Sequence, residues 1–300
     1  MSAQAGGARG QREDAAGAAA LDAAVQASVR SALAEDIGAG DLTGQLLDAD
    51  ALVDAQLIVR EPAVLCGTAW FEVVMHRVDA RIQVHWLAAD GAELVSGSTV
   101  CRLRGPARGL LTAERTAMNF LQLLSGVATA TRSYVQAVSQ VPGSCAKIFD
   151  TRKTIPGLRL AQKYAVRVGG GCNQRLGLYD AILIKENHIA AAGGVAAALR
   201  AALGKGVPVQ IEVESLEQLE EALAAGARSI LLDNFPIEAM REAVRRNQGR
   251  ALLEASGGVT LDTVRQIAAT GIDRISIGTL TKDVKATDYS MRVVALSSAR

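Results

Sequence analysis

Short apolar runs recur through the second half of the chain, and this rhythm constrains the fold more than any other feature. The runs are AKIF (146–149), AILI (181–184), VQIEV (209–213), SILL (229–232), ALLEA (251–255) and RISI (274–277). Between several of them lie helix-like segments closed by glycine, such as 216–226 and 261–271. Strands that alternate with helices in this way are typical of parallel βα units. We therefore expect either an α/β barrel or an open doubly wound sheet.

The residues that follow these runs favour the barrel. Each run is followed by a polar residue or a glycine, namely Asp150, Lys185, Glu214, Asp233, Ser256 and Gly278. A barrel builds its site from the carboxyl ends of many successive strands, whereas an open sheet concentrates functional residues at one switch point. The pattern predicts an α/β barrel with about six recognisable strands rather than eight.

The first half of the chain has a different organisation. Leu21, Val25, Val29 and Leu33 recur on one face of a helix expected over 21–36. Three β-rich runs follow at 55–60, 80–86 and 99–104, and helices are expected over 110–124 and 127–140, separated by Ser125-Gly126. These patterns predict an α+β region.

The domain boundaries follow from these patterns. Residues 1–20 are small and polar, without the apolar core of a signal peptide, and are predicted to be a flexible leader. We expect an N-terminal α+β domain over 21–114, with residues 286–300 packing back on it, and a barrel domain over 115–285.

Composition limits the possible partners. The 300 residues are 49% apolar, and the formal net charge of +1 gives no general attraction to nucleic acid or to an anionic membrane. No apolar stretch approaches the roughly 20 residues of a membrane span. The cysteines are far apart and form neither a CxxC pair nor a disulfide framework: Cys66, Cys101, Cys145 and Cys172. We expect a cytoplasmic protein that binds neither nucleic acid nor membranes.

Strong cations lie among glycines between residues 150 and 189. We single out Arg152, Lys153, Arg159, Arg175 and Lys185. Lys185 ends an apolar run, where a lysine is costly to enclose without a partner. Guanidinium groups bind carboxylate or phosphate in a two-point fork, and lysine adds a compact charge. The segment therefore predicts a site for a multiply anionic ligand, such as a sugar phosphate or a di-acid.

Acidic residues and glycine turns complete the expected site. Glu212 and Glu214 lie two apart and are expected on one strand face, and Asp233 ends another strand. Such carboxylates can bind ribose hydroxyls, hold Mg²⁺ or offset positive charge, although Glu214 is equally suited to an exposed strand end or a helix cap. Two later strand ends could cradle a phosphate with backbone N–H groups: Ser256-Gly257-Gly258 and Gly278-Thr279-Leu280.

The assembled motifs resemble quinolinate phosphoribosyltransferase, the carboxylating nicotinate-nucleotide pyrophosphorylase family of NAD biosynthesis. The resemblance covers nearly everything after residue 21. It is carried most specifically by DTRKTIPGLR (150–159) joined to GGGxNxRxGLxD (169–180), and also by ILIKENHI (182–189), LLDNF (231–235) and SGGV (256–259).

The resemblance implies a fold, an assembly and a reaction. The fold would be an N-terminal sandwich-like α+β domain followed by an incomplete α/β barrel. The assembly would be a homodimer in which one subunit's N-terminal domain closes the other's barrel; a higher oligomer is left open. Quinolinate would react with 5-phosphoribosyl 1-pyrophosphate, with Mg²⁺ as cofactor, to give nicotinate mononucleotide, pyrophosphate and CO₂.

The same resemblance assigns expected roles to matching residues. Lys153, Lys185, Glu212 and Asp233 would be catalytic. Mg²⁺ would be bound mainly through the substrate, with Glu212 and Asp233 as candidate ligands. Arg115 would reach into the neighbouring subunit's site. The complete set expected to bind substrates is Arg115, Thr151, Arg152, Lys153, Gln174, Arg175, Lys185, Glu212, Glu214, Asp233, Ser256, Gly257, Gly258, Gly278, Thr279 and Leu280.

One position departs from the family pattern. Where the family usually reads Asn-His-Arg, this chain has Asn173-Gln174-Arg175, which argues against an essential acid–base role there. Two other functions stay open on sequence grounds. One is a barrel aldolase that uses Lys185 as a Schiff base. The other is a non-catalytic relative that binds quinolinate without releasing CO₂ or pyrophosphate.

Overall fold

The computed structural model describes the backbone of residues 3–296 and the side chains of residues 17–294, and it divides into two compact units. The N-terminal unit comprises residues up to Thr129 together with Pro156–Val168 and the chain from Val284 onward. The barrel unit comprises Ala130–Ile155 and Gly169–Asp283. The domain boundary predicted between residues 114 and 115 lies inside helix α3 (Ala107–Ser139), which contributes residues to both units.

The N-terminal unit is built on an antiparallel sheet of strand order β12-β1-β5-β3, with a small β2-β4 ribbon. The terminal strand β12 pairs with β1, so that Val59 lies opposite Tyr289. Its elements, besides the first part of α3, are α1 (Ala3–Ile37), a 3-10 turn (Gly44–Leu46), β1 (Leu52–Val59), β2 (Ala63–Val64), α2 (Thr68–Val78), β3 (Gln83–Trp86), β4 (Glu93–Leu94), β5 (Thr99–Pro106), α4 (Arg159–Val168) and β12 (Tyr289–Leu296).

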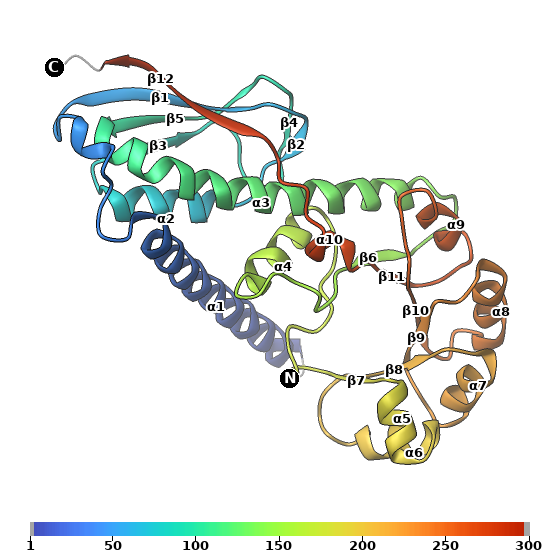
Figure 1. Ribbon diagram of the computed structural model, residues 1–300. Coiled ribbons are helices and arrows are strands. Elements are labelled where there is room, and N and C mark those ends of the chain that lie inside the picture. Colours follow the sequence, from blue (N-terminus) through green and yellow to red (C-terminus); the bar gives the residue numbers. More distant parts are fainter. Residues whose placement is uncertain (1–2, 297–300) are drawn as a thin grey trace. The chain divides into compact units, whose positions relative to one another are not determined.

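Strand alternation explains how this sheet packs. Every second residue of β1 is buried, including Leu57, and the residues between them are only partly covered. The buried face joins a single core with Trp70 and Phe71 of α2 and Leu121 of α3. Figure 1 shows α2 and α3 running beneath this sheet. Apolar burial on one sheet face thus holds the N-terminal unit together.

Two helix predictions need correction. Helices expected over 110–124 and 127–140 form one continuous 33-residue helix, α3. A Cβ at Gly126 would lie 2.2 Å from the carbonyl oxygen of Lys285, so this glycine permits a close backbone approach and does not end the helix. The first helix is longer than expected, because α1 begins at Ala3 within the segment predicted as a flexible leader. Its Ala-rich sequence has high helix propensity. Residues 1–2 and 297–300 lie outside the described residues.

The barrel unit is a six-stranded sheet of order β6-β11-β10-β9-β8-β7 in which all neighbours are parallel. Six parallel strands and the α/β class are as the sequence predicted. Its elements, besides the end of α3, are β6 (Lys147–Phe149), β7 (Ile182–Ile184), α5 (Glu186–Ala192), α6 (Val195–Ala202), β8 (Val209–Val213), α7 (Leu216–Ala224), β9 (Ser229–Asp233), α8 (Ile237–Asn247), β10 (Leu252–Ser256), α9 (Val264–Ala268), β11 (Arg274–Ser276) and α10 (Thr279–Lys282).

The two faces of this sheet differ in chemistry. Ile211, Ile230 and Leu253 point to the outer face and share one core with apolar side chains of α6, α7, α8 and α9, which cover that face in Figure 1. The alternate residues, such as Glu212 and Glu254, therefore point to the inner face. None of the described helices is long and apolar enough to cross a membrane.

Candidate active site

A pocket of about 640 Å³ lies at the carboxyl ends of the barrel strands, and every strand or the loop after it contributes to its lining. Thr151–Lys153 follow β6, Lys185 follows β7, Glu212 lies in β8, and Asp233 ends β9. The turns after β10 and β11 close the rim. Parallel strands place their carboxyl ends at one edge, which explains why residues far apart in sequence meet here.

Backbone and side-chain contacts hold the cations. The Lys153 N–H donates to Thr151 Oγ1 at 3.0 Å, and Thr281 Oγ1 donates to the Lys153 carbonyl at 2.7 Å. Arg175 Nη1 donates to the Ala181 carbonyl at 3.2 Å. Burial, together with nearby Arg152, lowers the pKa of the Arg175 guanidinium. Two guanidinium groups brought this close favour an anion between them.

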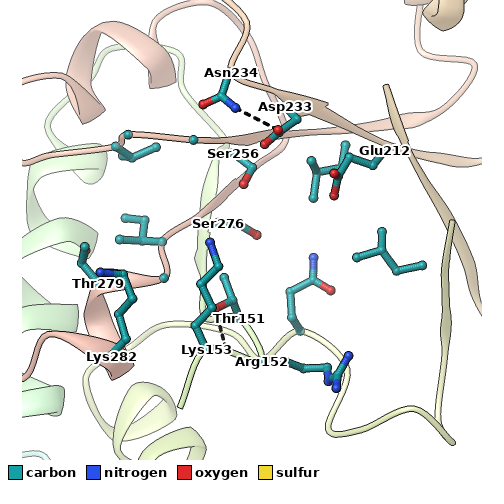
Figure 2. A pocket seen from close by; sticks show the side chains of 18 of the residues that line it. Thr151, Arg152, Lys153, Glu212, Asp233, Asn234, Ser256, Ser276, Thr279 and Lys282 are labelled. Carbon is teal, nitrogen blue, oxygen red and sulfur yellow. Dashed lines mark hydrogen bonds between the residues drawn. The ribbon is translucent and has the colours of Figure 1, made fainter. Parts of the chain in front are cut away.

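The two carboxylates of the pocket, Glu212 in β8 and Asp233 in β9, lie on neighbouring strands. Glu212 Oε2 pairs with Lys185 Nζ at 3.2 Å, and only 11% of the Glu212 side chain is exposed. Burial raises the pKa of Glu212, Lys185 opposes that shift, and Asp233 adds to it. Figure 2 shows Glu212 across the pocket from Thr279 and Lys282, with Asp233 near Ser256. The pocket therefore has a carboxylate side, formed by Glu212 and Asp233 with Lys185 paired to Glu212, and a further cation, Lys282, across from it.

The turn after β10 depends on glycine. Gly257 adopts φ +101°, and a Cβ there would lie 2.0 Å from Asn234 Oδ1. Asn234 itself has a positive φ of 55° and donates from Nδ2 to Asp233 Oδ2 at 2.8 Å. The close approach brings the backbone of 256–258 to the pocket wall, where its N–H groups can bind phosphate oxygens.

A buried polar network lies beneath the pocket. Glu254 is fully buried and accepts hydrogen bonds from Gln174 Nε2, Ser276 Oγ and Gln210 Nε2, the last at 2.9 Å. Gln174 Nε2 also lies 3.3 Å from Gln210 Oε1, and its backbone N–H donates to buried Asp150 Oδ1 at 2.8 Å. Inner layers of barrels are usually filled by branched apolar residues, so this polar floor is unusual.

Most residues predicted from the sequence line the pocket. They are Thr151, Arg152, Lys153, Gln174, Arg175, Lys185, Glu212, Asp233, Ser256, Gly257, Gly258, Gly278 and Thr279. Leu280 is buried in the apolar core and does not line it. Arg115 is exposed on α3 in the N-terminal unit, and Arg159 begins α4 there. Neither arginine lines the pocket.

The expectation that Glu214 shares a strand face with Glu212 is wrong. Strand β8 ends at Val213, so strand alternation no longer applies to Glu214, which is exposed and donates its N–H to Gln218 Oε1 at 2.8 Å. His188 of α5 accepts a hydrogen bond from the Lys185 N–H at 3.0 Å through Nδ1. It supports the loop after β7.

Sequence reasoning missed several residues of the site. Lys282 and Asn234 line the pocket, as do Leu183, Leu231, Val259, Ser276 and Ile277. Gln210, Glu254 and Ser276 had a readable signal, because each is a polar residue inside an apolar run, two positions before a pocket residue. Two residues along a strand return to the same face.

Comparison with known proteins gives one consistent family. The family model described as quinolinate phosphoribosyl transferase, C-terminal domain, matches residues 127–292, and the corresponding N-terminal domain matches 41–125. The chain is 46% identical over 277 residues to nicotinate-nucleotide pyrophosphorylase (carboxylating) of Mycobacterium leprae, covering 89% of this chain and 96% of that protein. It is 38% identical over 292 residues to the chloroplastic enzyme of that name from Arabidopsis thaliana, covering 90% and 82%.

Solved structures agree with these matches. The nicotinate-nucleotide pyrophosphorylase of Francisella tularensis superposes with a TM-score of 0.88 at 46% identity, covering 91% of this chain and 97% of that one. The similarity thus extends over both units and all barrel strands.

Proposed function

The chain belongs to the quinolinate phosphoribosyltransferase family, and from that premise we propose that it converts quinolinate and 5-phosphoribosyl 1-pyrophosphate to nicotinate mononucleotide, pyrophosphate and CO₂. The observation that carries the proposal is the pocket, which combines a carboxylate side with cations on several walls. One substrate is a pyridine dicarboxylate, and the other carries a phosphate and a pyrophosphate. Both need cations from more than one direction.

The reaction has two bond-breaking steps. The lone pair of the pyridine nitrogen forms a bond to C1 of the ribose while the bond from C1 to the pyrophosphate oxygen breaks, and its electron pair leaves with pyrophosphate. The bond to the 2-carboxylate then breaks, CO₂ is released, and one proton is delivered to the ring carbon. The nitrogen loses no proton in the first step, so that step needs no general base.

The residues suit the charges that develop. C1 becomes oxocarbenium-like as pyrophosphate leaves, and the carboxylates of Glu212 and Asp233 would bind the ribose and stabilise that positive charge. Arg152, Arg175 and Lys185 would bind quinolinate and phosphate oxygens, and Lys153 would meet the leaving pyrophosphate. The turns at 256–258 and 278–279, which line the pocket, would hold the 5-phosphate. The ion pair of Lys185 with Glu212 fits this binding role better than a Schiff-base nucleophile.

Mg²⁺ fits this pocket as an ion shared with substrate. Among the described residues no group of three or more His, Cys, Asp or Glu side chains could hold a metal alone. Mg²⁺ commonly takes one or two carboxylates together with substrate phosphates, and Glu212 and Asp233 would supply them here. When bound, the ion would neutralise charge on the pyrophosphate oxygens.

A single assay tests the activity. Pyrophosphate and CO₂ release are measured with 5-phosphoribosyl 1-pyrophosphate, Mg²⁺ and either quinolinate or nicotinate. We expect equal amounts of both products with quinolinate and neither with nicotinate at the same concentration. Binding of quinolinate without release would identify a non-catalytic relative. Borohydride trapping of a carbonyl substrate on Lys185 would identify an aldolase instead.

We also propose a homodimer in the cytoplasm. Arg115 is exposed, does not line the pocket of its own chain, and matches a family arginine expected to reach a neighbouring site. All four cysteines are free thiols, which suits a reducing compartment. The test of the shared site mixes inactive Arg115→Ala with inactive Lys185→Ala. Hybrids would contain one intact site and recover activity; no recovery after proven subunit exchange would contradict the shared site.

A further inference from the structure

Beneath the pocket, one buried carboxylate connects three segments of the wall. Glu254 of β10 is fully buried, and the hydrogen bonds of its carboxylate within the described residues come from three neutral side chains. Gln174 lies in the loop before β7, Gln210 in β8 and Ser276 in β11. A fully buried acid needs hydrogen-bond partners that an apolar side chain would not need, so its place beneath the pocket calls for an explanation.

Glu254 does not line the pocket, but each of the three segments that it contacts contributes residues that do. Two residues on from Gln210 is Glu212, and two residues on from Ser276 is Gly278; both line the pocket. Gln174 lines the pocket directly and precedes Arg175. Any effect of Glu254 on a ligand therefore passes through residues that Glu254 holds.

The chemistry of the contact fixes the orientation of Gln174. A carboxylate only accepts hydrogen bonds, so Gln174 turns its amide nitrogen, and not its oxygen, toward Glu254. The same nitrogen lies 3.3 Å from Gln210 Oε1, and Gln210 in turn donates to Glu254 Oε2 at 2.9 Å. Asp150 holds the Gln174 backbone from the end of β6. Side chain and main chain are thus anchored by two buried acids, one directly after β6 and one in β10.

We propose that Glu254 is a positioning residue that orients Gln174 for binding of the pyridine dicarboxylate. This inference rests on the proposed function, in which Arg175, the residue next to Gln174, binds quinolinate; both residues line the pocket. The usual family histidine is absent at position 174. A flexible amide needs an external partner to hold one orientation, and Glu254 supplies it.

The test is a double-mutant cycle in the full-length protein. Glu254→Gln places an amide donor opposite donors from Gln174, Gln210 and Ser276, so at least one hydrogen bond is lost whichever way the new amide turns. Gln174→Met keeps the length of the side chain and removes its polar atoms. KM and kcat are measured for each substrate in both single variants and in the double variant.

We expect Glu254→Gln to raise KM for quinolinate by about 10-fold or more, and KM for 5-phosphoribosyl 1-pyrophosphate by less than about threefold. Gln174→Met should act alike, and the double variant should exceed the worse single variant by less than about threefold. The matched control is Asp273→Asn, whose carboxylate accepts the Leu253 N–H at 2.7 Å before β11. It should leave both KM values unchanged.

Other results would overturn the inference. An unchanged KM for quinolinate in Glu254→Gln would do so, as would equal rises in both KM values or full additivity with Gln174→Met. Each of those outcomes would mean that Glu254 contributes to stability alone and does not position Gln174 for quinolinate binding. If Glu254→Gln does not fold, Glu254→Asp takes its place in the cycle, because it keeps the charge and withdraws the carboxylate by one methylene.

The wild-type protein separates this inference from the proposed function. Absence of pyrophosphate release by the wild type would refute the proposed function alone. The cycle is then measured on quinolinate binding by calorimetry, where coupling between positions 174 and 254 would still support the inference. A wild type that binds no quinolinate refutes both.

Discussion

The two sheets of this protein use strand alternation for different purposes. In β1 of the N-terminal unit one face is buried and apolar, and Leu57 is fully enclosed. In β8 of the barrel unit the apolar residues face the helices, and the inner face carries Gln210 and Glu212. The N-terminal sheet therefore uses its buried face for stability, whereas the barrel assigns stability to its outer face and chemistry to its inner face.

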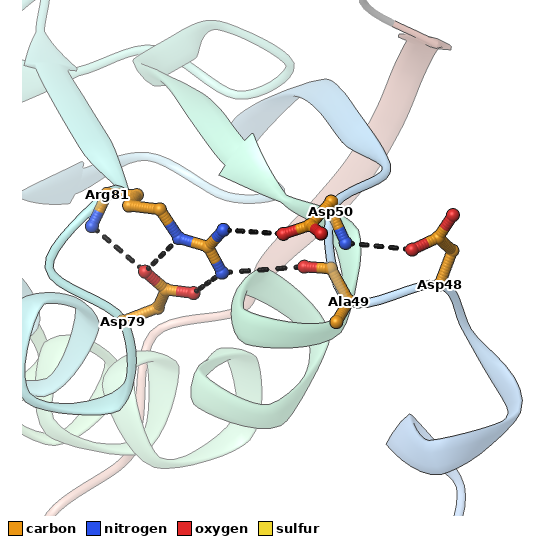
Figure 3. A network of polar contacts seen from close by, with 5 residues as sticks. All are labelled: Asp48, Ala49, Asp50, Asp79 and Arg81. Carbon is orange, nitrogen blue, oxygen red and sulfur yellow. Dashed lines mark hydrogen bonds and ion pairs between the residues drawn. The ribbon is translucent and has the colours of Figure 1, made fainter.

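The charged groups of the two units differ in the same way. Arg81 in the N-terminal unit contacts Asp79 at 2.7 Å and Asp50 at 2.9 Å, and 55% of its side chain is exposed (Figure 3). The Asp50 side chain is 85% exposed, and an exposed pair of this kind contributes little, because water screens it. The barrel instead partly buries its cations beside one another and beside a carboxylate of raised pKa. Charges held at such a cost indicate a binding site.

The largest expected effect comes from removing a barrel cation. Arg152→Ala and Lys153→Ala should each lower kcat/KM for quinolinate by about 100- to 1000-fold, because an enclosed anion is left without its counter-charge. Arg81→Ala is the matched control and should change kcat/KM by less than about twofold. Steady-state kinetics decides this, and near-normal values for both barrel variants would remove the contrast between the units.

A second prediction concerns two buried leucines. Leu57→Ala in β1 and Leu253→Ala in β10 should each lower the free energy of unfolding by about 2–5 kcal/mol, because both side chains are almost fully buried. Only Leu253→Ala should also reduce kcat/KM, since β10 carries Glu254 and Ser256. Denaturant unfolding and kinetics below the melting temperature measure both quantities. Equal losses of activity would contradict the separation of roles.

A smaller effect is expected at the position that departs from the family. Gln174→His should change kcat/KM by less than about tenfold, or roughly 1.4 kcal/mol, because attack by the pyridine nitrogen needs no proton removed. An imidazole N–H can replace the amide as donor to Glu254. A gain of about a hundredfold on installing histidine would instead assign proton transfer to this position.

The smallest expected effect follows from the raised pKa of Glu212. Its ordinary value is 4.5, and burial raises it in the folded state, so the folded protein binds this proton more tightly than the unfolded chain. The wild type should therefore gain stability relative to Glu212→Gln as pH falls through the folded pKa toward 4.5. At pH 7 the variant should melt higher by on the order of 1–2 °C. Melting curves of both proteins across this pH range test the prediction. It would be contradicted if the excess in melting temperature of the variant over the wild type increased as the pH falls.

Local periodicity made much of the fold predictable. Six apolar runs of strand length located the six barrel strands, and polar residues at their ends located the pocket. The helix break at Ser125-Gly126 failed because a glycine that permits tight packing looks the same in sequence as one that ends a helix. The placement of Glu214 failed because alternation holds only as far as the strand extends, and β8 ends one residue earlier.

The sequence by itself determined the fold class, the order of strands and helices, and the residue types at the mouth of the barrel, because those depend on patterns that span a few residues. Only the tertiary structure decided which inward residues meet. Gln174 and Glu254 are 80 positions apart and come together beneath the pocket. Contacts over that separation depend on strand register and on the curvature of the sheet, which no local pattern encodes.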